Sequence, residues 1–176
     1  MQREEWRGPG VIDLSQFHLA ACCDASLSAD TCEARIGVSV VLVNHGDLTD
    51  ERPLLYAWTK ERAQHPSDAE RTAIRFAYIC LDRSDIMERM RAVCPEQGTL
   101  KTASLLNDCQ TVVDAFVRSR DLGYVQEIFR SRYTCDLNIE WESNQKHSRS
   151  SCMALVDRMA NAARTSLKLY EEVFCL

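Results

Sequence analysis

Three apolar runs separated by polar turns occupy the first part of the chain. The first starts at Phe17 (FHLAACCDAS) and ends near Asp24, the second covers Ile36–Val43, and the third covers Pro53–Lys60. The second run is rich in β-branched residues, and a polar turn that contains Gly46 follows it. Such a series predicts three strands joined as an antiparallel meander.

The period of the apolar positions becomes helical after Pro66, and Ser67 is placed to cap the helix. The apolar positions are three or four residues apart: Ala69, Ala73, Ile74, Ala77 and Leu81. The helix either continues through Met90 or breaks at Asp82–Asp85. Glu70 shares the apolar face of this helix, because Ala73 and Ile74 lie three and four residues beyond it.

Strand and helix patterns alternate in the second half of the chain. The predicted elements are a strand over Leu100–Leu106, helices over Cys109–Val117 and Gly123–Tyr133, a strand over Leu137–Trp141, and a last helix carrying Met153, Val156, Ala160, Ala163 and Leu167. A helix between two strands implies parallel pairing. The fold class is therefore α/β, with a five-stranded mixed sheet (three antiparallel strands, then parallel strands) flanked by helices.

Size and composition predict one globular domain. The chain has 176 residues, of which 45% are hydrophobic and 27% charged, so we assign 16–176 to a single domain and 1–15 to an N-terminal leader. No apolar run is long enough to span a bilayer, and the start has no signal-peptide core. We therefore expect an intracellular protein, cytoplasmic or nuclear and not secreted, that has no membrane partner.

The cysteines and the net charge narrow the chemistry. Nine cysteines are present without a CxxC pair, so we expect reduced, mostly buried thiols rather than a zinc site or a disulfide framework. The adjacent Cys22 and Cys23 should point to opposite faces of a strand. A formal net charge of -5 gives no general attraction to nucleic acid, so binding of that kind needs a local basic patch or bound metal.

Four acidic residues interrupt apolar stretches: Asp24, Glu70, Asp108 and Asp157. Taken singly, each has an ordinary explanation as a turn former, a helix cap, a solvated helix residue or one half of an ion pair. Taken together, four carboxylates repel one another unless a cation lies between them. Hydrolysis of a phosphodiester uses two such cations about 4 Å apart, and carboxylates are the ligands that Mg²⁺ or Mn²⁺ prefers.

The order of these motifs resembles that of type 1 ribonuclease H over roughly 17–164. The residues that carry the resemblance are CCDAS, AERTAIRFA, LLNDCQTVV, IEW and VDRMANAAR, with one acid in each of four expected places. The resemblance implies a ribonuclease H-like fold in which Asp24, Glu70, Asp108 and Asp157 bind two Mg²⁺ (or Mn²⁺) ions. The implied activity is endonucleolytic hydrolysis of RNA in RNA–DNA hybrids.

The resemblance also assigns residues outside the acidic set. His147 matches the loop histidine that relays a proton, and Gln110 matches a position that contacts the substrate backbone. The chain departs from the family pattern in three places, since it lacks a glycine-rich loop after Asp24, the asparagines before the helix acid, and a lysine-rich protrusion. Ser67 is a possible substitute for one of those asparagines as a substrate contact. These departures leave hybrid specificity open, and a protein partner could supply affinity.

Three functional hypotheses remain at this point. The first is the metal-dependent endonuclease, with nucleic acid as its partner and an RNA–DNA hybrid as the favoured substrate. The second is a catalytically inactive ribonuclease H-like interaction module in a larger nucleic-acid assembly. The third is a related nuclease of the same fold, of the resolvase or transposase kind. Retention of all four acids favours an enzyme, because a scaffold has no need of mutually repelling carboxylates.

Overall fold

A mixed β-sheet forms the centre of the protein. The computed structural model describes residues 16–47, 50–93, 100–119, 121–133, 135–142 and 170–173. The strands are β1 (Phe17–Ser28), β2 (Glu33–Asn44), β3 (Glu51–Arg62), β4 (Thr102–Asn107), β5 (Leu137–Trp141) and β6 (Tyr170–Val173). The helices are α1 (Pro66–Leu81), α2 (Ile86–Val93), α3 (Gln110–Val117) and α4 (Asp121–Tyr133).

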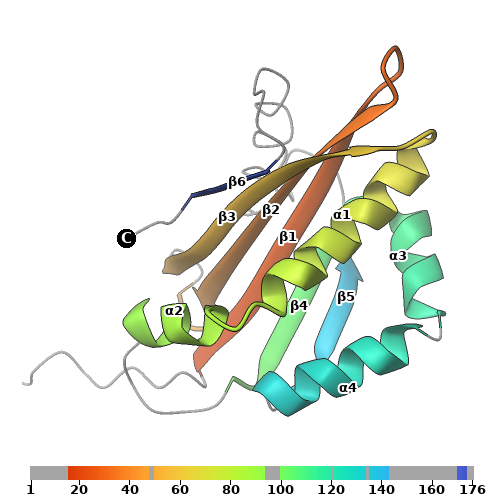
Figure 1. Ribbon diagram of the computed structural model, residues 1–176. Coiled ribbons are helices and arrows are strands. Elements are labelled where there is room, and N and C mark those ends of the chain that lie inside the picture. Colours follow the sequence, from red (N-terminus) through yellow and green to blue (C-terminus); the bar gives the residue numbers. More distant parts are fainter. Residues whose placement is uncertain are drawn as a thin grey trace, which may run out of the picture.

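The strand order is β5-β4-β1-β2-β3-β6 (Figure 1). β1, β2 and β3 pair antiparallel, and β4 and β5 continue the sheet in parallel with β1. The predicted mixed sheet of three antiparallel strands followed by parallel strands is therefore confirmed. The short β6, which pairs antiparallel with β3, is an additional strand that the sequence pattern did not predict.

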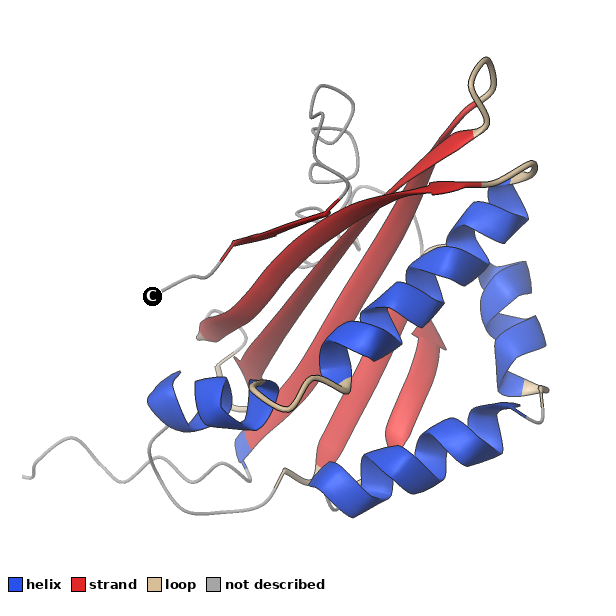
Figure 2. Ribbon diagram, in the orientation of Figure 1, coloured by secondary structure: helices blue, strands red, loops and turns tan. Residues whose placement is uncertain are grey.

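The described helices cover one face of the sheet (Figure 2). The main core joins alternate residues of β1 and β2 to apolar residues of all four helices, among them Ile74 of α1, Met90 of α2, Val112 of α3 and Phe129 of α4. Cys23 belongs to this core, whereas Cys22 packs in a small cluster on the opposite face. The two cysteines thus point to opposite faces, as their adjacency in a strand requires.

β1 continues beyond the point where the sequence pattern ended it. Asp24 pairs with Gly37 of β2, and the ladder extends to Ser28 opposite Glu33. The prediction that the strand ends at Asp24 is therefore wrong. The longer strand is stabilised because Leu27 and Ala25 pack against a small alanine cluster, formed by Ala34, Ala63 and Ala69.

Helix α1 begins two residues earlier than predicted. Its N-cap is His65, which has an extended backbone and no side-chain capping bond, and Pro66 follows inside the helix. Ser67 is therefore not the cap, because proline supplies the preset backbone angle and has no N–H to satisfy at the first helical position. At the other end, α1 stops at Asp82 and α2 starts at Ile86, so of the two alternatives the break is correct.

The structure also bears on the expected state of the cysteines and on the expected absence of a membrane-spanning segment. Cys23, Cys32, Cys80, Cys109 and Cys135 are free thiols, as expected. Cys22, however, is disulfide-bonded, so the expectation that every cysteine is reduced is wrong. None of the helices in the described ranges combines the length and the hydropathy needed to cross a bilayer. The predicted leader 1–15 and the helix predicted around 153–167 lie outside those ranges.

Candidate metal centre

Three of the four predicted acids meet beside the inner strand β1, just beyond the carboxyl end of β4. Asp24, Glu70 and Asp108 each place a carboxylate oxygen within 4.8 Å of the others. The register explains the meeting of two of them, because Cys22 of β1 lies opposite Leu106 of parallel β4, and Asp24 and Asp108 each follow by two residues. Helix α1 packs across one face of the sheet (Figure 1). Its residue Glu70 contributes the third carboxylate of the cluster.

The site destabilises negative charge in the absence of a cation. The pKa of Glu70 is raised from 4.5 to about 7, first by burial and further by the charge of Asp108. Hydrogen bonds from the Asn107 side chain and from the Ala25 backbone N–H act in the opposite direction. Asp24 is only 6% exposed and accepts a 2.9 Å hydrogen bond from the Ala25 N–H. A cation between the three carboxylates would relieve both the desolvation and the repulsion.

Asn107 is a site residue that the sequence reasoning missed. Its side chain is completely buried, and its Nδ2 donates to Glu70 Oε2 at 2.8 Å and to the Cys23 carbonyl at 3.2 Å. Its Oδ1 accepts from the Cys109 N–H at 2.9 Å. Asn107 therefore fixes the Glu70 carboxylate relative to β1 and to the start of α3. The available signal was a polar residue at the end of an apolar strand, directly before Asp108.

The backbone around Asp108 is anchored from β5. The indole Nε1 of Trp141 donates to the Asp108 carbonyl at 3.1 Å, and the Glu142 N–H donates to the Asn107 carbonyl at 3.0 Å. Trp141 is nevertheless 45% exposed, so its ring lies at the solvent edge of the metal centre. Because these two hydrogen bonds fix the main chain at Asn107 and Asp108, they fix the backbone position from which the Asp108 side chain extends.

Of the other predicted site residues, two are exposed near the clustered acids in the sequence and two lie outside the described residues. Gln110 is exposed at the first position of α3, two residues after Asp108. Ser67 is exposed in the first turn of α1, three residues before Glu70. His147 and Asp157 lie outside the described residues, so their assignment stays a prediction.

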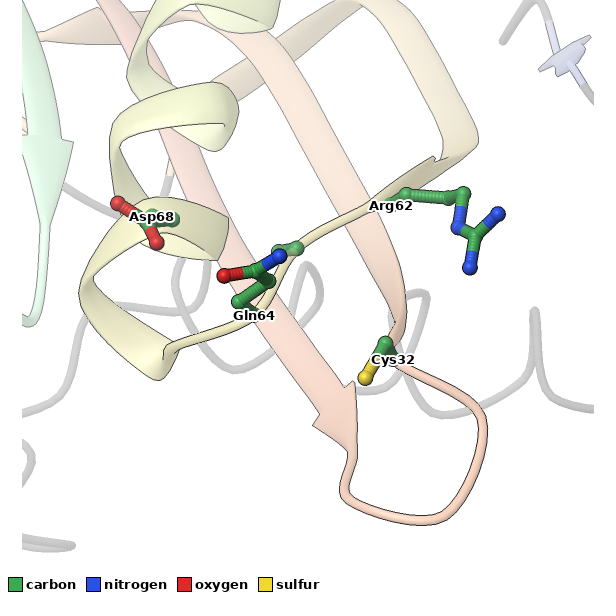
Figure 3. Close-up of a pocket in the computed structure, with 5 residues that line it drawn as sticks. Cys32, Arg62, Gln64 and Asp68 are labelled. Carbon is green, nitrogen blue, oxygen red and sulfur yellow. The ribbon is translucent and has the colours of Figure 1, made fainter.

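A polar hollow of about 400 Å³ lies beside the first turn of α1 (Figure 3). It is lined by Cys32 of the β1–β2 turn, by Arg62, Ala63 and Gln64 of the segment that leads from β3 into α1, and by Asp68. Cys32 has a positive φ of 53°, a backbone conformation that more often belongs to glycine. None of the three clustered acids lines this hollow, which is therefore separate from the metal centre.

The chemistry of the donors indicates which cations fit. The three clustered groups are carboxylates, and the nearest buried neighbour, Asn107, is an amide. Hard oxygen donors of this kind suit Mg²⁺ or Mn²⁺ rather than metals that prefer thiolate or imidazole. The described residues therefore fit a divalent, oxygen-seeking cation held by Asp24, Glu70 and Asp108.

Comparison with solved structures identifies the architecture. LC9-RNase H1, a type 1 RNase H with the type 2 active-site motif, superposes with a TM-score of 0.52 and 14% identity, over 86% of this chain and 74% of that one. The chain has the ribonuclease H-like fold. The prototype foamy virus protease–reverse transcriptase (CSH mutant) gives a TM-score of 0.52 and 16% identity, over 92% of this chain.

The same comparisons limit what the ribonuclease H-like fold implies for this chain. The chain spans only 23% of the foamy virus protein. No protein-family model matches the sequence, and no curated protein matches it. At 14% and 16% identity the two structures establish the fold alone, so the activity must be argued from the residues of the metal centre.

Proposed function

We propose that this protein is a metal-dependent endonuclease that hydrolyses the RNA strand of RNA–DNA hybrids. The observation that carries the proposal is the convergence of Asp24, Glu70 and Asp108 within 4.8 Å on a ribonuclease H-like fold. Three carboxylates so close together, with Asp24 and Glu70 buried and Asp108 partly buried, destabilise a protein unless they bind something. Their retention is therefore best explained by a catalytic cation site.

Each residue of the centre has a definable task in this proposal. Asp24, Glu70 and Asp108 hold two Mg²⁺ or Mn²⁺ ions, together with Asp157 from the predicted last helix. Such ions, when bound, make a water nucleophilic near neutral pH and offset the charge on the leaving oxygen. Asn107 orients the Glu70 carboxylate through the 2.8 Å hydrogen bond from its Nδ2 to Glu70 Oε2. His147 relays a proton.

Substrate contacts are proposed for residues on either side of the centre. Gln110 and Ser67 are exposed at the first turns of α3 and α1, close in sequence to Asp108 and Glu70. Both offer hydrogen-bonding groups to a nucleic-acid backbone or to a ribose 2′-hydroxyl. Because the chain carries a formal net charge of -5, we expect a protein partner to supply part of the affinity.

A cleavage panel tests this function directly. Labelled RNA–DNA hybrid, double-stranded RNA, single-stranded RNA and double-stranded DNA are incubated with Mg²⁺, Mn²⁺ or EDTA. Wild type is compared with Asp108→Asn and with Asp30→Asn, which makes the same change at an exposed position in the β1–β2 turn. We expect cleavage of the hybrid with either metal, loss of cleavage in Asp108→Asn, and normal cleavage in Asp30→Asn.

The other outcomes discriminate between the hypotheses. Cutting of double-stranded RNA or DNA in preference to the hybrid would support a nuclease that has a different substrate from the one proposed. A folded wild-type protein that cuts nothing under any of these conditions would contradict the proposal and favour the interaction module.

A further inference from the structure

A second hollow, of about 190 Å³, lies between α1 and α3. It is lined by Arg71 and Arg75 of α1, by Val112, Ala115 and Phe116 of α3, and by Ser119 just beyond α3. The two helices lie side by side at this point (Figure 1). Arg71 and Arg75 are four residues apart, so their side chains project from the same face of α1 toward the hollow.

Within the described ranges, the polar groups of this hollow form neither an ion pair nor a side-chain hydrogen bond. No ion pair joins Arg71 or Arg75 to any acid among the described residues, and both side chains are exposed. The Ser119 hydroxyl is buried and makes no hydrogen bond within the described part of the chain. A buried hydroxyl without a partner is costly, so it indicates a place for a group that is not part of the chain.

The floor of the hollow is apolar. Val112 is 2% exposed, and Phe116 packs partly buried against the main core. None of the described lining residues is acidic. An anion in this position would therefore meet two guanidinium groups and one hydroxyl donor above a surface of low polarity, where charge-assisted hydrogen bonds are stronger than in water.

We propose that the hollow formed by Arg71, Arg75 and Ser119 binds a backbone phosphate of the nucleic acid, away from the phosphate that is cut. Two guanidinium forks match the oxygens of a phosphate, and the Ser119 hydroxyl donates to a third. This inference rests on the proposed function, since it takes the bound chain to be the substrate of the metal centre.

The position of the hollow agrees with such a role. Arg71 directly follows Glu70, and Arg75 is five residues beyond it, which corresponds to about 7.5 Å along the helix axis. Successive phosphates of one strand advance by about 3.4 Å along a duplex. A phosphate in the hollow would therefore belong to a nucleotide a few steps from the scissile bond. The contact would hold the duplex in register and would supply a basic site to a chain whose formal net charge is -5.

Binding of a short RNA–DNA hybrid in EDTA tests the contact without cleavage. The variants are Arg71→Gln, Arg75→Gln and Ser119→Ala, and the control is Arg91→Gln, which removes the same charge from an exposed position on α2. We expect each arginine variant of the hollow to bind roughly three- to tenfold more weakly, and Ser119→Ala about threefold. The slope of log K against log salt is negative, and its magnitude should decrease by no more than about one in each arginine variant, because both arginines contact a single phosphate.

A second probe identifies the contact itself. Hybrids that carry one uncharged methylphosphonate linkage at successive positions are bound to wild type and to Arg71→Gln. A methylphosphonate at one particular position should weaken binding to wild type but should hardly change the affinity of Arg71→Gln. The reason is that the linkage and the substitution remove the same interaction.

The inference would be overturned if Arg91→Gln lost as much affinity for the hybrid as Arg71→Gln and Arg75→Gln do. It would also be overturned if the effects of the methylphosphonate and of Arg71→Gln on affinity were additive at every position of the linkage. Cleavage of hybrid by wild type together with unchanged binding in Arg71→Gln and Arg75→Gln would overturn this inference alone. A wild-type protein that neither cuts nor binds any nucleic acid would reject the proposed function, and this inference with it.

Discussion

Replacement of Asn107 by alanine should destabilise the protein and disturb the metal centre together. The side chain is completely buried and connects three separate elements. It donates to Glu70 at 2.8 Å and to the Cys23 carbonyl at 3.2 Å, and it accepts from the Cys109 N–H at 2.9 Å. Alanine removes all three interactions and leaves their partners inside the protein.

The size of the loss depends on the charge of Glu70. The two bonds to backbone groups contribute about 1 kcal/mol each, and a bond to an ionised carboxylate contributes about 1.5–3 kcal/mol. The pKa of Glu70 is about 7, so this third bond has its full strength only above that pH. We therefore expect the free energy of unfolding to fall by about 2 kcal/mol at pH 6 and by about 4 kcal/mol at pH 8.5.

Urea denaturation in EDTA at these two pH values measures the effect, with circular dichroism to confirm that the variant folds. The matched control is Asn138→Ala on β5, where the asparagine side chain is exposed and a change within about 0.5 kcal/mol is expected. If Asn107→Ala loses no more stability than Asn138→Ala, the role given to Asn107 is refuted. A loss that does not grow with pH would refute its link to Glu70.

Three further predictions concern the acids and the histidine. Asp24→Asn and Asp108→Asn should each abolish cleavage while leaving metal-free protein as stable as wild type or more so, as thermal unfolding in EDTA would show, because one of the repelling charges is removed. The pKa of Glu70 is raised from 4.5 to about 7, so in EDTA its contribution to the free energy of unfolding is greatest below about pH 4.5 and is lost as the pH rises toward 7. The free energy of unfolding should decrease by at most about 3 kcal/mol over this range. A Glu70→Gln variant that keeps the same pH dependence would count against this. His147→Ala should slow cleavage without eliminating it, which single-turnover rates would establish, and complete loss of cleavage would contradict a relay role.

Local sequence patterns predicted β1 to β5 and the helices between them, and they singled out the three acids that meet in the structure. Strand and helix periods gave the mixed sheet, since β-branched runs and three- and four-residue spacings report directly on which face is buried. The helices between β4 and β5 predicted the parallel pairing of those two strands. The parallel pairing of β1 with β4, which aligns Asp24 with Asp108, is a finding of the structure. Glu70 was found because it shares the apolar face of α1 with Ala73 and Ile74.

Features that depend on tertiary packing could not be found in this way. The extension of β1 to Ser28 depends on an alanine cluster built from β2, from the residue after β3 and from α1, which no window of sequence contains. The start of α1 at Pro66 was decided by proline at the first helical position rather than by the serine beside it. The role of Asn107 depends on distances to Glu70 and Cys23, residues that lie 37 and 84 positions away along the chain.

Binding of Mn²⁺ by the folded protein is the most direct test of the metal centre. Bound Mn²⁺ is measured by paramagnetic resonance at pH 7.5 for wild type, Asp108→Asn and the control Asp30→Asn, each with and without a hybrid that cannot be cut. We expect wild type and Asp30→Asn to bind Mn²⁺, and to bind more of it with the hybrid present, whereas Asp108→Asn should bind little or none. Equal binding by all three proteins, or no binding by wild type even with the hybrid, would contradict this expectation.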